Sequence, residues 1–91
     1  MDYESLVKSI ISQQELIIGP VAIEEANKVD GLNVSMDGEV VTLANDGKEI
    51  LGNLVKQYAS LFGRVSIEVC KEAVLSASPS FEKTNLPDIL K

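Results

Sequence analysis

Apolar residues recur every three or four positions over residues 3–17, which is the period of a helix with one buried face. Gly19-Pro20 interrupts this pattern. Because proline suits the first turn of a helix and not its interior, we expect either a second helix over residues 20–29 or a kinked continuation of the first. The first stripe consists of Tyr3, Leu6, Val7, Ile10, Ile11, Gln14 and Ile17. In the second segment, the residues expected to face inward are Val21, Ala22, Ala26 and Val29, and those expected to face solvent are Glu24, Glu25 and Lys28.

After Gly31 the pattern changes to alternation, which indicates strands. Residues 32–36 and 39–43 flank Asp37-Gly38, a dipeptide typical of a two-residue hairpin turn. A second helical stripe follows over residues 47–62, with a turn and cap before it and Gly63 as its stop. Its expected buried members are Ile50, Leu51, Leu54, Val55, Tyr58, Leu61 and Phe62.

Residues 64–70 alternate once more, with Val65, Ile67 and Val69 on one face, and this predicts a third strand that could pair with either strand of the hairpin. Residues 72–77 fit a short helix or a continued strand, and we favour the helix. The predicted fold is a single α+β domain over residues 1–78, in the order α-α-β-β-α-β-α, with a three-stranded sheet and helices packed on one face. The polar residues 79–91 are expected to form a tail in which Leu86, Ile89 and Leu90 allow a short helix.

The charge of the chain restricts its partners. Residues 1–49 hold ten acidic residues against three lysines, and the whole chain of 91 residues has a net charge of −6. Such a surface disfavours direct binding to nucleic acid or to a membrane and tolerates a basic protein surface. The single cysteine excludes an internal disulfide, and the start of the chain has no targeting signal. Both observations favour a cytoplasmic location.

The chain lacks histidine, the commonest general base near neutral pH and the commonest metal ligand. A Ser-His-Asp triad and a Cys-His dyad are therefore excluded. We expect the lone Cys70 to be a small structural residue. Asp46-Gly47-Lys48 does not complete a phosphate-binding loop, since Thr42 stands where the first glycine belongs and Glu49 where Ser or Thr belongs. We predict no enzymatic activity, no cofactor and no metal site.

The remaining function classes depend on binding. We expect a small acidic cytosolic protein-interaction or regulatory module, an adaptor or complex subunit, that forms a homodimer or contacts a protein with a basic surface. The open edges of a small sheet could also be extended by another chain. The alternative is a small-molecule sensing domain with an apolar pocket between the helices and the sheet. Residues 16–23 hold more apolar side chains than one buried face needs, and the candidate partner-binding residues are Leu16, Ile17, Ile18, Val21, Ile23, Glu24 and Glu25.

Overall fold

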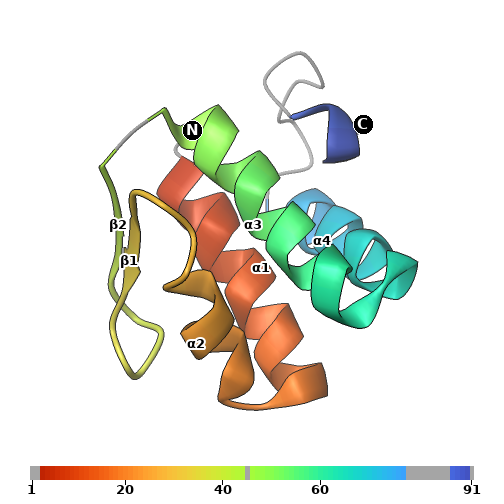
Figure 1. Cartoon of the computed structure of the whole chain (residues 1–91), viewed down its shortest axis with the longest axis horizontal. Helices are drawn as coiled ribbons and strands as arrows, with labels where there is room; N and C mark the ends of the chain where they lie inside the picture. The colour runs from red at the N-terminus through yellow and green to blue at the C-terminus, as the bar shows by residue number, and fades with distance from the viewer. Residues whose placement is uncertain (1–2, 45, 78–86, 91) are drawn as a thin grey trace.

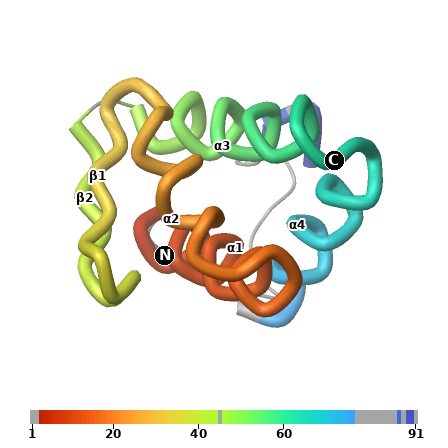
Figure 2. Tube along the Cα trace, turned by 60° about the horizontal axis from the view of Figure 1, so that its bottom comes forward, coloured from red at the N-terminus to blue at the C-terminus, as the bar shows by residue number. Residues whose placement is uncertain are grey.

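The computed structural model describes residues 3–44, 46–77 and 87–90. The elements of these residues are, in chain order, α1 (Tyr3–Ile18), α2 (Val21–Ala26), β1 (Leu32–Val34), β2 (Val41–Leu43), α3 (Gly47–Phe62), α4 (Arg64–Ala77) and the short 3-10 helix η2 (Asp88–Leu90). In Figure 1, α1 and α3 run through the middle, with α2 and the hairpin on one side and α4 on the other. Figure 2 shows the same helices with α3 above and α1 below. The predicted α+β class is confirmed.

The predicted third strand is wrong, because Arg64–Ala77 forms one helix, α4, which includes the short helix favoured over residues 72–77. Gly63 ends α3 with φ +82° and donates its backbone N–H to the carbonyl of Ala59 at 2.8 Å, and α4 begins at the next residue. The sheet therefore has two strands, and the described elements run α-α-β-β-α-α before η2. The side chains that α4 buries have helical spacing and are mostly small: Ser66, Cys70, Ala73 and Val74.

Of the two alternatives for residues 20–29, the separate helix is observed, but it ends at Ala26 and not at residue 29. Gly19 has φ +74° and donates its N–H to the carbonyl of Glu15 at 2.8 Å, and Pro20 precedes the first residue of α2. α2 departs from the predicted faces at two positions. Val21 is exposed because it opens the helix at its uncovered end, and Glu25 is buried because it is hydrogen-bonded inside the fold.

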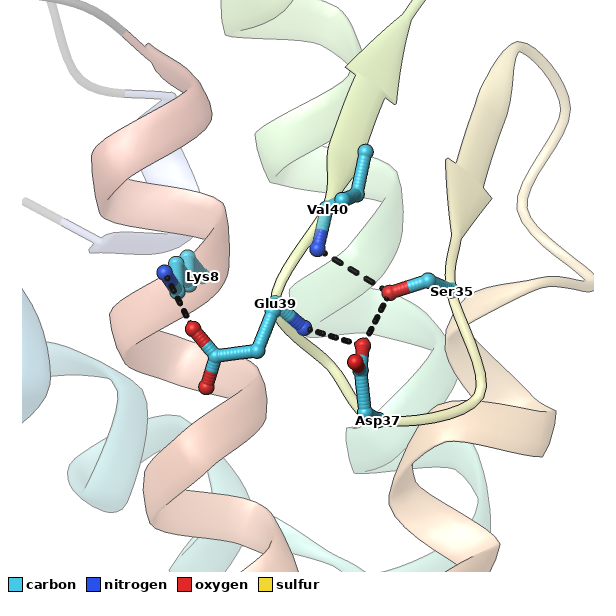
Figure 3. Close-up of polar contacts among 5 residues, drawn as sticks. All are labelled: Lys8, Ser35, Asp37, Glu39 and Val40. Carbon is cyan, nitrogen blue, oxygen red and sulfur yellow. Dashed lines mark hydrogen bonds and ion pairs between the residues drawn. The ribbon is translucent and has the colours of Figure 1, made fainter.

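The hairpin is antiparallel as predicted, with Leu32 paired with Leu43 and Val34 with Val41. Its turn differs from the prediction: residues 36–39 form a four-residue loop, and the N–H of Ser35 donates to the carbonyl of Val40 at 2.9 Å. Side chains hold this wider loop. The hydroxyl of Ser35 accepts from the N–H of Val40 at 3.0 Å, and the carboxylate of Asp37 accepts from the N–H of Glu39 at 2.9 Å (Figure 3). These side-chain bonds add to a backbone turn in which the N–H of Gly38 donates to the carbonyl of Ser35 at 2.9 Å.

α3 has the bounds that the sequence predicts, and its start is capped by the carboxylate of Asp46, which accepts from the N–H of Lys48 at 3.4 Å. Near its middle, Gly52 leaves room for Pro87, whose Cβ would lie 3.0 Å from an added Cβ. η2 packs against α3 and α4 there and buries Leu90 in the core. Residues 78–86 lie outside the described residues, so the domain boundary near residue 78 stays a prediction.

Candidate interaction surface

The polar groups in the core serve the structure. The side-chain amide of Gln14 donates to the carbonyl of Ser66 at 3.3 Å and contacts the sulfur of Cys70 at 3.6 Å. Burial raises the pKa of the Cys70 thiol to about 11, an effect that the contact with Gln14 partly offsets. The thiol is therefore protonated at neutral pH and inaccessible to a substrate. Among the described residues, no group of three or more Cys, Asp or Glu side chains could hold a metal ion.

Of the two adjacent acids in α2, Glu25 is engaged within the fold. Its carboxylate accepts from the amide of Gln57 at 2.8 Å and pairs with Lys28 at 2.9 Å, which joins α2 to α3. These two hydrogen bonds, that of Lys28 first, lower the pKa of Glu25. Glu24 is exposed. The structure thus leaves only Glu24 of this pair accessible to a partner.

We describe three surface hollows of about 330, 360 and 300 Å³. Most of the residues that line them are of charged or polar type, and none of the seven candidate partner-binding residues is among them. The first lies between the start of α3 and η2, the second between α1 and α4, and the third between α1 and the hairpin. All three hollows are open to solvent, and none of them is an enclosed apolar cavity of the kind that buries a small ligand.

The apolar stripe of α1 continues beyond the core. Gln14 is the last buried residue of α1, and Ile17 and Ile18 follow it by three and four positions on the same side of the helix. Ile17 is nevertheless 60% exposed, and Ile18 is partly buried. Leu16 points away from this stripe and is also exposed. The prediction that Ile17 belongs to the buried stripe is wrong, because the elements that partly cover Ile18 leave Ile17 in solvent.

α3 repeats this arrangement. Tyr58 is its last buried residue, and Leu61 and Phe62 follow by three and four positions. Leu61 is 51% exposed and Phe62 41% exposed, so their predicted burial is also wrong. The reason is the same: the stripe extends one turn past the elements packed against it.

Two contacts place these uncovered turns at one end of the molecule. Gln14 of α1 bonds to Ser66 of α4, and the hydroxyl of Tyr58 of α3 donates to the carbonyl of Ala22 of α2 at 2.6 Å. The residue before Ser66 is Val65, 70% exposed, and the residue before Ala22 is the exposed Val21. Val65 and Val21 therefore lie one residue before a residue that makes one of these contacts. The exposed residues of α1 and α3 lie one helical turn after Gln14 and Tyr58. We call this surface the apolar end, formed by Ile17, Ile18, Val21, Leu61, Phe62 and Val65.

The sheet offers less to a partner than the sequence suggests. The side chain of Asn27 bonds to both backbone groups of Val34, accepting from its N–H at 2.8 Å and donating to its carbonyl at 3.0 Å. The N–H of Leu32 donates to the carbonyl of Val29 at 3.1 Å. The outer edge of β1 is therefore occupied by the chain itself. At the hairpin loop, Lys8 of α1 pairs with Glu39 at 3.1 Å (Figure 3).

Of the seven candidate residues, the apolar end contains Ile17, Ile18 and Val21; Leu16 and Glu24 are exposed nearby, and Ile23 and Glu25 are buried. Leu61, Phe62 and Val65 are not among the candidates from the sequence, because their spacing predicts a buried helical stripe for Leu61 and Phe62 and a strand for Val65. One feature of the sequence could have identified them. Each of the two apolar stripes extends a full helical turn beyond its last buried residue, Gln14 or Tyr58.

No protein-family model matches the chain, and neither a curated protein nor a solved structure matches it significantly. No helix in the described part of the chain has the length and apolar character required to cross a membrane.

Proposed function

We propose that this chain is a non-catalytic, cytosolic protein-interaction module, an adaptor or complex subunit, whose contact surface is the apolar end. The observation that carries the proposal is the continuation of two helical stripes, at the same end of the fold, to side chains exposed to solvent. Scattered exposed apolar residues are ordinary, whereas a group of them gathered at one end of a small domain is typical of a binding surface.

The arrangement of the helices supports protein contact. Four helix ends converge at the apolar end, so its side chains are held on regular backbone, with Gln14 and Tyr58 fixing the four helices to one another. A surface of this kind needs little ordering when a partner binds, which lowers the entropic cost of association. Apolar side chains that stay in water cost about 25 cal/mol per Å² relative to burial, so a partner that covers them gains that free energy.

Small-molecule sensing remains the alternative prediction, and it would require an apolar pocket between the helices and the sheet. In that region the hollow between α1 and the hairpin is lined by Glu4, Ser5, Lys8, Glu39, Val40 and Val41, and it is open to solvent rather than enclosed. Protein contact at the apolar end therefore accounts better for the exposed residues.

The test compares Ile17→Lys with Leu75→Lys. Both residues lie in the last turn of a helix, and they are 60% and 65% exposed, but only Ile17 belongs to the apolar end. A lysine near a helix C-terminus is favourable, so both variants should fold. Immobilised wild type, Ile17→Lys and Leu75→Lys are compared for the proteins they retain from an extract of the source cells. We expect Ile17→Lys alone to lose specific partners, and equal retention by all three would refute the proposal.

A further inference from the structure

Building on the proposed function, we infer that the partner of the apolar end is a second copy of this chain. The two copies pair about a two-fold axis, with Arg64 of each copy facing Glu24 of the other.

The charges beside the apolar end are the first argument. Arg64 opens α4 next to Val65, and Glu24 lies three residues after Val21 on the exposed side of α2. α2 and α4 lie on opposite sides of the molecule, with α3 above and α1 below in Figure 2. The apolar end thus has a base at one side and an acid at the other.

A two-fold interface between two such ends forms two equivalent charge contacts. In an isologous contact, if residue i of one copy contacts residue j of the other, then residue j of the first copy also contacts residue i of the second. Apolar end against apolar end therefore brings Arg64 of one copy to Glu24 of the other at both margins. Neither side chain has an ion pair among the described residues, so neither must give up a partner to make this contact.

The second argument is the amount of apolar surface. Of the nine large hydrophobic side chains that are exposed in the described residues, Ile17, Val21, Leu61, Phe62 and Val65 lie at the apolar end. A stable dimer of standard size buries about 800 Å² per partner, against a total surface of 5171 Å² for this chain. Six side chains at one end of so small a chain make an interface below this standard size, so we expect a weak dimer with a micromolar dissociation constant.

The net charge of −6 does not forbid this pairing. Charges more than about 8 Å apart are largely screened at physiological ionic strength, so the acids of the hairpin and of the start of α1 contribute little across the interface. The local Arg64–Glu24 contacts act at short range and oppose the residual repulsion. A partner with a basic surface is the competing occupant, and the experiment separates the two.

The experiment is sedimentation equilibrium of the full chain between about 5 and about 500 µM at physiological salt, a range chosen to bracket micromolar affinity. We expect a concentration-dependent dimer that Val65→Asp abolishes. An acidic residue in the first turn of a helix is favourable, so this variant should stay folded, and circular dichroism checks this. If it unfolds, Ile17→Lys, at the opposite part of the same surface, provides the same test.

Charge exchange then tests the orientation. Arg64→Glu and Glu24→Arg should each weaken the dimer about tenfold by replacing two attractions with two repulsions. The double variant should restore the affinity to within about threefold of wild type, since it recreates both pairs with exchanged signs. Lys56→Glu, on the exposed side of α3, makes the same charge change as Arg64→Glu and should have little effect.

Each result decides a different point. A monomer at all concentrations overturns the pairing, while the Ile17→Lys comparison still decides the proposed function independently. A dimer that survives Val65→Asp overturns its placement on the apolar end. Weakening by both single charge variants without restoration in the double variant overturns the two-fold arrangement, and so does growth into larger oligomers.

Discussion

The hydroxyl of Tyr58 joins α3 to α2, and its removal should have an effect that changes sign with pH. The side chain is fully buried, and its hydroxyl donates to the carbonyl of Ala22 at 2.6 Å. Tyr58→Phe keeps the ring and removes the hydrogen bond. At neutral pH we expect the variant to lose about 1 kcal/mol of unfolding free energy, the usual net contribution of one such bond.

At alkaline pH the hydroxyl lowers the free energy of unfolding. Burial raises the pKa of Tyr58 in the folded chain well above its ordinary value of about 10, and the negative charges of Cys70, Glu15 and Glu25 add to the effect. The unfolded chain therefore releases this proton first, and the folded state loses stability as pH rises above about 10. At pH 11 the loss from this group is about 1.4 kcal/mol. Phenylalanine has no such proton, so the two curves should cross between about pH 10.5 and 11.

Urea unfolding followed by circular dichroism, from pH 7 to about pH 11.5, measures this difference directly. Every other titrating group is common to both proteins and cancels in the comparison, provided that the pair behaves additively. A difference in stability that stays constant across the whole range would refute the reasoning. It would mean that the hydroxyl titrates alike in the folded and unfolded chains, and hence that it is not buried.

Two further predictions concern the core and the hairpin. Burial raises the pKa of Cys70 to about 11 from an ordinary value of 9.0. Iodoacetamide at pH 8 should therefore alkylate the folded chain at least about 100-fold more slowly than the urea-unfolded chain. Equal rates would contradict the burial of the thiol. Asn27→Ala removes two hydrogen bonds to Val34 and should cost about 1–2 kcal/mol in urea unfolding; the exposed Asn33→Ala serves as control, and an equal effect of both would show that the closure of β1 contributes nothing.

The sequence predicted the elements whose buried face is large and apolar. The spacing of Leu6, Ile10, Leu51 and Leu54 gives a clear helical period, and α1 and α3 were predicted within a residue or two of their bounds. α4 was missed because its buried face consists of small residues such as Ser66, Cys70 and Ala73, which carry little hydrophobic signal. The β-branched residues of α4 alternate on its less buried sides and imitate a strand.

The sequence predicts three of the six residues of the apolar end, those after Gln14 in α1 and at the start of α2. The excess of apolar residues after Gln14 identified Ile17 and Val21 from local composition alone. The other half, at the junction of α3 and α4, depends on where neighbouring helices end, and that is a tertiary fact. Phe62 has the spacing of a core residue, and only the position of α2 against Tyr58 shows that the core stops one turn earlier.

The Asn27 side chain on the outer edge of β1 also has a consequence for solubility. Unpaired strand edges are templates on which other chains aggregate, and natural proteins usually protect them with charges, prolines or bulges. Here a neutral amide occupies both free groups of Val34 from the same chain. Because an amide does not titrate, this protection persists across the pH range in which the fold is stable, and it makes the β1 edge a poor nucleus for fibril growth.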